Sequence, residues 1–369
     1  MKLSCNQQLL SKAINTVSKA VTARTTLPLL KGILLEADGT QLKLTASDLD
    51  LSIERIIPVT VSEPGVIVLS ARLFGDIIRK LPNEEIEIET GENHMVTIRC
   101  TGSEFNIMGQ KEDEFPKIGA VDDSEKLSIE KNILREMIRK TSFAASIEEA
   151  KGIIIGVLME LEENSLNLIA LDGFRMAVTK EPLKNQKTAR IIAAARILNE
   201  INKILGEEEE NETVELVLDH KKAVFFLKDI RIVARLLEGE YIRYREILPK
   251  ENSCQVKVDR GELADSIERA SLMAREGKSN LIKMNISDDR LVIHSRSDEG
   301  KVREEVFIEK SGQDLEIGLN AKFLHDVLRA ITDEEIRMEF NTSVSPCLIR
   351  PLEGDGFLYL ILPVRMIAG

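Results

Sequence analysis

One pattern occurs three times along the chain, and this repeat constrains the fold more than any other feature of the sequence. A segment typical of a strand followed by an amphipathic helix occupies residues 66–81, 190–205 and 316–331. Equivalent positions of the three segments hold a basic residue, namely Arg72, Arg196 and Lys322. A period of about 120 residues is far longer than that of a solenoid repeat. It therefore predicts three similar domains.

The remainder of each copy repeats as well. A short strand and an amphipathic helix begin each copy, at residues 2–21, 127–145 and 256–274. Two alternating runs around a turn follow, at residues 33–48, 157–172 and 282–297. Segments 112–126 and 245–253 combine proline with charge, as connectors do. We expect an α+β fold of three domains, each with two helices and antiparallel sheets, at residues 1–120, 121–250 and 251–369.

Composition excludes several classes of protein. The four cysteines, Cys5, Cys100, Cys254 and Cys347, lie far apart, which favours neither a thiolate metal site nor a disulfide scaffold. The longest apolar run, residues 152–159, is too short to span a bilayer, and residues 1–12 lack the apolar region of a signal peptide. We therefore expect a cytoplasmic protein with no membrane partner.

The positive charge gathers on the expected helices. Although the net charge is −12, six helical segments together carry +8 and the rest of the chain −20. These segments are residues 6–26, 70–81, 130–143, 194–205, 259–278 and 320–331. Apolar stripes should pack each helix on a sheet and turn its charged face outward. In the first two helices the stripes are Leu9, Leu10, Ala13, Ile14 and Val17, then Phe74, Ile77, Ile78 and Leu81. Five of the six helices thus present a basic side.

Signatures of catalysis are missing from the sequence. It contains no phosphate-binding loop, dinucleotide fingerprint, HExxH or GxSxG motif. The histidines lie in different repeats without metal-ligand spacing, and Asp48 and Asp50 have no third acidic partner in sequence. The acidic run at residues 206–212 is typical of a solvated loop. We therefore expect no catalytic residue, no metal and no cofactor.

Four segments carry a resemblance to a known family: TARTTLPLLKGILLE, LSARLFGDIIRKLP, GVLMELEENSLNLIALDGFRMAV and the terminal LYLILPVR. Together they closely resemble the bacterial DNA polymerase III β subunits, the sliding clamps, along essentially the whole chain. The resemblance implies a DNA clamp fold and a head-to-tail homodimer that closes into a ring around double-stranded DNA without reading its sequence. A ring also removes the free sheet ends of its subunits. It would act in DNA replication as a processivity factor, associated with the nucleoid.

The resemblance assigns Arg24 and Arg72 to DNA contact, and Lys12, Arg196 and Lys322 share the basic helices. Lys151 lies in a loop, residues 146–153, that matches a DNA-contacting loop of the family. Some relatives carry two adjacent tyrosines there, where this chain has Gly152 and Ile153. Stacking on DNA bases is therefore not expected from these two positions.

The resemblance also implies two protein-binding surfaces. Phe105 and Ile107 should face Leu272 and Met273 across the dimer interface. Short peptides from the polymerase III catalytic subunit, the clamp loader, other polymerases and repair proteins should bind an apolar pocket between the second and third domains. Its expected residues are Ile154, Leu171, Gly173, Phe174, Arg175, Met176, Ile242, Ile247, Leu360, Leu362, Pro363, Val364 and Arg365. Ile242 stands in GEYIRY where many relatives have proline, and residues 366–369 extend past the usual terminal arginine.

Two other classes of function stay open at the level of sequence. One is a DNA-processing enzyme with an unrecognised metal site, which metal-dependent strand cleavage would reveal. The other is a scaffold that binds proteins but not DNA.

Overall fold

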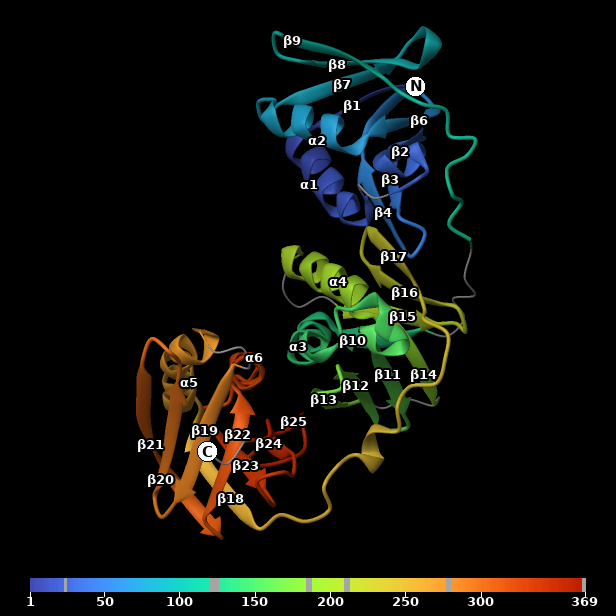
Figure 1. Ribbon diagram of the computed structural model, residues 1–369. Helices are drawn as coiled ribbons and strands as arrows, with labels where there is room; N and C mark the ends of the chain where they lie inside the picture. Colours follow the sequence, from blue (N-terminus) through green and yellow to red (C-terminus); the bar gives the residue numbers. More distant parts are fainter. Residues whose placement is uncertain (23–24, 120–125, 184–187, 209–212, 277–279, 367–369) are drawn as a thin grey trace. The chain divides into compact units, whose positions relative to one another are not determined.

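A computed structural model describes residues 1–22, 25–119, 126–183, 188–208, 213–276 and 280–366. The chain forms two compact units (Figure 1). Unit 1 comprises Met1–Asn132 and Lys203–Leu236, and unit 2 comprises Ile133–Asn202 and Leu237–Gly369. The predicted domain limits at residues 120 and 250 stay a prediction. None of the described helices is both long and apolar enough to cross a membrane.

The described elements occur in three similar series. The first is β1 (Lys2–Asn6), α1 (Gln7–Val17), β2 (Gly32–Asp38), β3 (Gln41–Ser47), β4 (Leu51–Pro58), β5 (Thr60–Glu63), β6 (Gly65–Ser70), α2 (Ala71–Lys80), β7 (Glu85–Thr90), β8 (Met95–Cys100) and β9 (Ser103–Met108). The second is β10 (Leu127–Glu130), α3 (Lys131–Thr141), β11 (Gly156–Glu162), β12 (Ser165–Leu171), β13 (Arg175–Pro182), β14 (Ala189–Ala194), α4 (Ala195–Glu207), β15 (Thr213–Leu218), β16 (Lys222–Leu227) and β17 (Ile230–Arg235). The third is β18 (Cys254–Asp259), α5 (Arg260–Glu276), β19 (Leu281–Ser287), β20 (Arg290–Arg296), β21 (Lys301–Gly312), β22 (Leu315–Asn320), α6 (Ala321–Ala330), β23 (Glu335–Phe340), β24 (Cys347–Pro351) and β25 (Phe357–Ile361).

The predicted repeat is confirmed element by element. Each series runs strand, helix, three strands, strand, helix and three strands, and β5 is the one described addition, in the first series. Arg72, Arg196 and Lys322 are each the second residue of the second helix of their series, and all three side chains are exposed. The sequence alignment of the three copies therefore corresponds to a structural equivalence.

Unit 1 contains two antiparallel sheets. The five-stranded sheet has the order β5-β1-β7-β8-β9, and the eight-stranded sheet has the order β10-β15-β16-β17-β4-β3-β2-β6. Helices α1 and α2 lie next to each other and pack on the strands with their apolar stripes (Figure 1). The buried residues of these stripes are Leu10, Ala13, Ile14 and Val17 in α1, and Phe74, Ile77 and Ile78 in α2.

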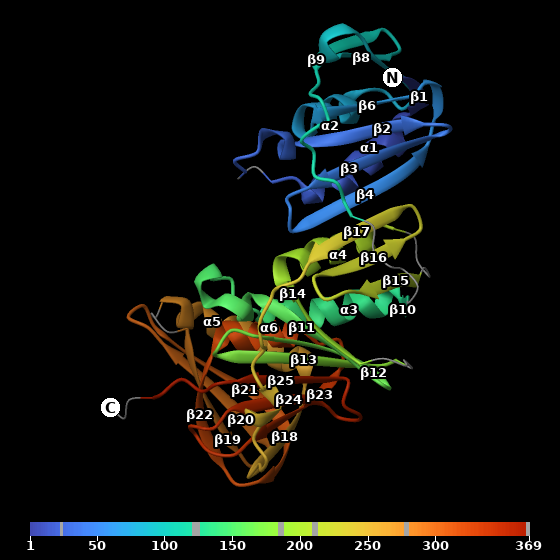
Figure 2. The same ribbon diagram turned by 90° about the vertical axis from the view of Figure 1, so that its right-hand side faces the viewer.

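Unit 2 contains a twelve-stranded sheet with the order β14-β11-β12-β13-β25-β24-β23-β18-β21-β20-β19-β22 (Figure 2). Helices α5 and α6 pack against each other, and α5 also packs on β20 and β21. Strand β21 changes partner along its length: residues 301–307 pair with β20, and residues 308–312 pair with β18.

The first helix is shorter than predicted. It begins at Gln7, where the Asn6 side chain accepts hydrogen bonds from the backbone N–H groups of Gln8 and Leu9. It ends at Val17 rather than at Thr26, and after one 3-10 turn Val21 is already extended. The β-branched pair Val21 and Thr22 favours extended backbone over helix. The apolar stripe also included Leu9 wrongly, because this side chain is exposed.

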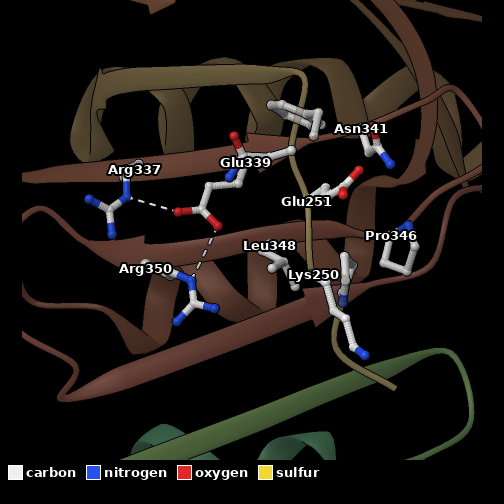
Figure 3. A pocket seen from close by; sticks show the side chains of 11 residues that line it. Lys250, Glu251, Arg337, Glu339, Asn341, Pro346, Leu348 and Arg350 are labelled. Carbon is white, nitrogen blue, oxygen red and sulfur yellow. Dashed lines mark hydrogen bonds and ion pairs between the residues drawn. The ribbon is translucent and has the colours of Figure 1, made fainter. Parts of the chain in front are cut away.

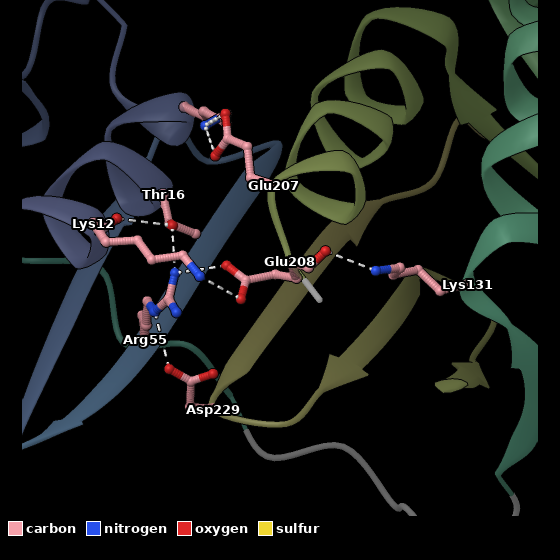
Figure 4. Close-up of polar contacts among 8 residues, drawn as sticks. Lys12, Thr16, Arg55, Lys131, Glu207, Glu208 and Asp229 are labelled. Atoms are coloured by element: carbon pink, nitrogen blue, oxygen red, sulfur yellow. Dashed lines mark hydrogen bonds and ion pairs between the residues drawn. The ribbon is translucent and has the colours of Figure 1, made fainter. Parts of the chain in front are cut away.

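The acidic run at residues 206–212 is only partly as expected. Helix α4 continues into it as far as Glu207, and the Glu208 side chain is only 8% exposed. The Glu208 carboxylate binds Arg55 Nη1 at 2.9 Å and Lys12 Nζ at 2.9 Å (Figure 4). The prediction of a solvated loop is therefore wrong for Glu208. Residues 209–212 lie outside the described part of the chain.

Candidate functional site

The residues predicted to contact DNA occupy different local environments. Arg72, Arg196 and Lys322 each lie in the first turn of a helix, with exposed side chains. Lys12 is exposed on α1, yet its ammonium group is paired with Glu208. The neighbouring Lys19 is paired in the same way with Glu207, at 2.8 Å. A phosphate group approaching α1 would thus compete with two carboxylates of the same unit.

Two further DNA-contact predictions have different outcomes. Arg24 lies outside the described residues. Lys151 is half-buried, 3.2 Å from the Glu148 carboxylate, and its ammonium group lies 5.7 Å from the centre of the Phe174 ring. The predicted DNA-contact loop therefore lies beside Phe174, a residue of the predicted peptide pocket.

The predicted pocket residues of unit 2 gather on one apolar cluster. Leu171, Met176 and Leu360 are buried in it, and Ile154 and Leu362 pack against it. The strand register explains this, because Leu171 lies opposite Met176 on β13, and Met176 lies opposite Leu360 on β25. Residues directly opposite each other share one face of a sheet. Two separated stretches of the predicted pocket, residues 154–176 and 360–362, thus contribute to one apolar cluster, and the pocket itself stays a prediction.

The segment after β17 crosses this face of the sheet and is held there by two tyrosines. Tyr241 and Tyr244 are buried in the apolar cluster, and the Tyr241 hydroxyl donates to the backbone carbonyls of Gly156 and Ile169. Ile242 lies between the two tyrosines and Ile247 follows them, and these isoleucine side chains are 40% and 43% exposed. Of this segment, only the two isoleucines were predicted from the sequence. The tyrosines themselves were missed, although an aromatic residue on each side of Ile242 was the available signal.

A buried carboxylate fixes the same segment. Glu160 of β11 accepts hydrogen bonds from the Tyr244 hydroxyl at 2.9 Å and from Arg245 at 2.6 Å and 3.1 Å, and Arg190 lies 3.3 Å away. Burial alone would raise the pKa of Glu160, but the hydrogen bonds from Arg245 and Tyr244 outweigh it, and the pKa lies below its ordinary value. The carboxylate is therefore ionised and acts as an anchor for the segment.

The turn before β13 presents one aromatic residue and buries one cation. Gly173 has a positive φ of 94°, a conformation that glycine adopts without strain. Phe174 is exposed and stacks on Phe323 with 6.3 Å between ring centres. The Arg175 guanidinium is engaged with Asp172 and Asp326. The predicted pocket residue Arg175 thus holds the turn in place.

The terminal segment continues the cluster beyond β25. The backbone N–H of Leu362 donates to the Phe174 carbonyl at 2.8 Å, and that of Val364 donates to Gly318 at 2.9 Å. Leu362, Pro363 and Val364 are half-buried, whereas Arg365 is exposed. A side chain at Gly318 would collide with the Val364 carbonyl, so glycine is required for this close approach.

Strand pairs link one repeat to the next at equivalent positions. Two of the three possible pairs are formed, and in the described part of the chain the strands of the third have no partner at this position. The last strand of the second series, β17, pairs with β4 of the first, and β25 of the third pairs with β13 of the second. Strands β4, β13 and β21 hold the same place in the three series, and β9, β17 and β25 are the last strand of each. By this equivalence, β9 should pair with the start of β21. Within the described residues, β9 pairs along its length only with β8, and the first half of β21 pairs only with β20.

Exposed apolar side chains accompany both open edges. Phe105 is 39% exposed on β9, whereas Ile107 is buried. On α5, Leu272 is 56% exposed and Met273 is half-buried, and Phe307 of β21 is also exposed. Large apolar side chains left in solvent beside an unpaired strand indicate a protein interface.

The described residues contain no group of three or more His, Cys, Asp or Glu side chains arranged to hold a metal ion. All four cysteines are free and buried. Asp48, weighed above as a metal ligand, accepts hydrogen bonds from the backbone N–H groups of Asp50 and Leu51. Its carboxylate thereby stabilises the turn before β4.

Comparison with known proteins identifies the class to which this architecture belongs. Three family models match in order: the DNA polymerase III beta subunit N-terminal domain at residues 1–119, central domain at 128–242 and C-terminal domain at 245–365. The chain therefore belongs to the DNA polymerase III beta subunit family, the beta sliding clamps.

Individual relatives agree over the full chain. The beta sliding clamp of Staphylococcus aureus strain Mu50 is 34% identical, with 99% of both chains covered. The DNA polymerase sliding clamp of Bacillus subtilis superposes with a TM-score of 0.97 at 33% identity, over all of both chains. A putative DNA polymerase III beta subunit of Eubacterium rectale superposes with a TM-score of 0.95 at 36% identity, covering 99% of this chain and 100% of that one.

Proposed function

We propose that the protein is a beta sliding clamp whose two copies join head to tail into a ring around duplex DNA. The open strand junction carries this proposal. Two of the three equivalent junctions are made within the chain, so β9 of one copy and β21 of another supply the third. A two-fold arrangement makes this junction twice and leaves neither β9 nor the start of β21 without a partner. The division into domains at residues 120 and 250 is part of the same proposal.

The ring would act on DNA by topology and charge rather than by catalysis. Basic residues at the helix starts, Arg72, Arg196 and Lys322, with Lys12, Arg24 and Lys151, would meet phosphates without reading bases. Enclosure prevents escape while sliding continues. A polymerase bound to the ring stays at a high effective concentration near the primer end. We place the protein in the cytoplasm, on the nucleoid, with no cofactor.

Retention on circular DNA tests the ring directly. After loading, the protein should remain on a closed circle through gel filtration and should dissociate when the DNA is cut once. Dissociation from closed and linear DNA at equal rates would contradict enclosure. Strand cleavage that depends on added metal would instead indicate an enzyme.

Reversing the charge of Arg24 and Arg72 together should weaken DNA association while the chain stays folded, since Arg72 is exposed. Losing two phosphate contacts should reduce the slope of log affinity against log salt by about 2. DNA binding is measured by fluorescence anisotropy over a salt series. Lys43→Glu with Lys283→Glu is the matched control, because it makes the same charge change on strands. Equal weakening by both pairs would mean that only net charge matters.

Truncating Leu272 and Met273 to alanine should convert the dimer into folded monomers. The change removes several methylenes from the proposed interface, at about 0.8 kcal/mol each. Sedimentation velocity gives the oligomeric state and circular dichroism the folding. Val344→Ala is the control, because Val344 is similarly exposed, at 72%, but lies far in sequence from α5. A persistent dimer would place the interface elsewhere.

We also propose that the apolar cluster of unit 2 is the floor of the pocket for partner peptides. Leu171, Met176 and Leu360 are buried in the cluster, and exposed Phe174 and Ile242 are close in sequence to cluster members Met176 and Tyr241, so we propose these exposed side chains as the apolar rim. Short peptides from the polymerase III catalytic subunit, the clamp loader, other polymerases and repair proteins would insert apolar side chains there.

Deleting residues 362–369 should abolish binding of a polymerase-derived peptide and leave the dimer intact. The deletion removes Leu362 from the cluster and both backbone hydrogen bonds of the terminal segment, while β25 stays complete. Fluorescence polarisation measures peptide affinity. A deletion of residues 367–369 alone is the control and should bind as the full chain does. If the longer deletion keeps its affinity, the terminal segment is no part of the pocket.

A further inference from the structure

A polar cavity of about 290 Å³ lies beside the apolar cluster of unit 2, and Figure 3 shows the side chains that line it. Three cationic and two acidic side chains line it: Lys250, Arg337, Arg350, Glu251 and Glu339. Leu348 lies in its wall and is also a member of the apolar cluster. The cavity and the proposed peptide pocket therefore meet at Leu348.

The strand register makes this continuity specific. One row of directly opposite residues crosses the sheet from β12 to β23, and its members are Leu171, Met176, Leu360, Leu348 and Glu339. The four residues on β12, β13, β25 and β24 are apolar, and the fifth, on β23, is the charged Glu339. Since neighbouring strands lie about 4.8 Å apart, Glu339 is about 10 Å from Leu360. An extended peptide covers that distance in about three residues.

The two arginines of the cavity share a single internal counter-ion. Arg337 and Arg350 lie directly opposite each other on β23 and β24, an arrangement of like charges that is destabilising without an anion nearby. Glu339 supplies one carboxylate, whose oxygens lie 3.0 Å from Arg337 Nε and 3.3 Å from Arg350 Nε (Figure 3). Among the described residues, Glu339 is the only acidic partner of either guanidinium.

The contacts with Glu339 leave much of both guanidinium groups available. The nearest guanidinium atom to Glu339 is Nε in both arginines, and the Arg337 Nε is not oriented for a hydrogen bond even at 3.0 Å. A guanidinium carries five N–H donors, so the terminal nitrogens of both groups can still receive an acceptor. About a third of each side chain is exposed. Paired terminal nitrogens match the two oxygens of a carboxylate.

We propose that this cavity is a second subsite, in which Arg337 and Arg350 bind an acidic side chain of the same peptide that fills the apolar pocket. The acidic residue would stand about three positions from the nearest apolar anchor. The inference rests on the proposed peptide pocket. It adds a requirement for charge to a proposed site whose other part is apolar.

A random 12-residue peptide library displayed on phage is the first probe. Selection on the intact protein should enrich peptides with apolar anchors and with Asp or Glu at one fixed offset from them. Apolar anchors without an acidic position would overturn the acidic subsite and leave the pocket standing. Failure to select any apolar peptide would overturn both.

A matched pair of selected peptides then measures the subsite by fluorescence polarisation. One peptide keeps its acidic residue, and the other has the corresponding amide. In low salt the acidic peptide should bind the wild type about fivefold to tenfold more tightly. In the variant Arg337→Gln with Arg350→Gln this ratio should fall below about twofold, while the amide peptide keeps its affinity. Arg290→Gln on β20 is the control and should leave the ratio unchanged.

Glu339→Gln gives an independent test, because it should change the ratio of acidic to amide affinity in the opposite direction. It removes the internal competitor and keeps both arginines, so the ratio of acidic to amide affinity should rise severalfold. A ratio that falls in Glu339→Gln, or one that survives loss of both arginines, would overturn the proposal. Affinity of the amide peptide shows in every variant that the apolar pocket is still folded.

Discussion

Glu208→Gln should lower the free energy of unfolding of unit 1 by about 3 kcal/mol, because it takes one of two carboxylates from buried Arg55 and also the partner of exposed Lys12. Arg55 is only 7% exposed and is held by Glu208, Asp229 and the Thr16 hydroxyl (Figure 4). Lys12 binds the other oxygen of Glu208. Since Asp229 remains, we place the loss at the lower end of the range for a broken buried pair. Hydrogen exchange of the α1 amides in urea measures the change.

The neighbouring residue supplies the control. Glu207 pairs with Lys19, but its side chain is 40% exposed, so Glu207→Gln should cost less than about 1 kcal/mol. Both variants remove one negative charge from the same end of α4. Equal losses in the two would show that net charge, rather than the buried network, determines the stability of this region.

The same network makes unit 1 sensitive to acid. Burial alone would raise the pKa of Glu208, but the hydrogen bond from Lys12 and the charge of Arg55 outweigh it, and the pKa lies below its ordinary value of 4.5. The folded state therefore keeps the carboxylate ionised at a pH where the unfolded chain has protonated it. The stabilisation is complete above the unfolded pKa and is lost as the pH falls through the lower folded pKa. The stability difference between wild type and Glu208→Gln should narrow accordingly below pH 4.5.

The repeat explains why most of the fold could be predicted. Because the pattern occurs three times, each helix and strand can be predicted from three sequences. An ambiguous segment in one copy is then resolved by the equivalent segments of the other two. The open junction between β9 and β21 follows from the same equivalence once the pairing of β4 with β17 and of β13 with β25 is known. Strand pairing between distant segments leaves no local signal, so the sequence alone could not supply it.

The misassigned residues share one cause. Glu208 stands in a run of acidic residues that is typical of a loop, and its partners Arg55 and Lys12 are more than 150 residues away in sequence. The helical periodicity of the apolar residues places Leu9 in the buried stripe. How wide a face of α1 is buried, however, depends on the strands on which the helix packs. In both cases burial depends on tertiary contacts that no window of sequence contains.

The sequence identified buried residues of the apolar cluster, which we propose as the floor of the peptide pocket, but not the residues that support the segment over it. Buried strand residues such as Leu171, Met176 and Leu360 carry the family resemblance directly. Tyr241, Tyr244 and Glu160 act by holding the covering segment, and a buried glutamate in an alternating strand resembles any surface glutamate in sequence. Its partners identify it only in three dimensions.

Glu160→Ala should therefore weaken peptide binding at least tenfold, although Glu160 is buried beneath the segment and does not face the peptide. The change leaves the buried Tyr244 hydroxyl without its acceptor and removes both hydrogen bonds from Arg245 to Glu160, so that Arg245 keeps only Glu162; we expect a cost of about 2 kcal/mol. The segment that carries Ile242 and Ile247 would lose its anchor on β11, so the pocket rim would have to be ordered during binding. Fluorescence polarisation with a polymerase-derived peptide measures the affinity, and urea unfolding of unit 2 measures the stability.

Glu162→Ala separates this anchoring role from a general loss of negative charge. Glu162 also binds Arg245, at 2.8 Å, but its side chain is 46% exposed, and the Tyr244 hydroxyl donates its hydrogen bond to Glu160 instead. We expect it to change the stability of unit 2 by less than about 1 kcal/mol and the peptide affinity by less than about twofold. Tyr244→Phe, which deletes only the hydroxyl, should fall between the two. If Glu160→Ala loses stability yet binds peptide as the wild type does, the segment shapes the fold but not the pocket, and Ile242 is not part of its rim.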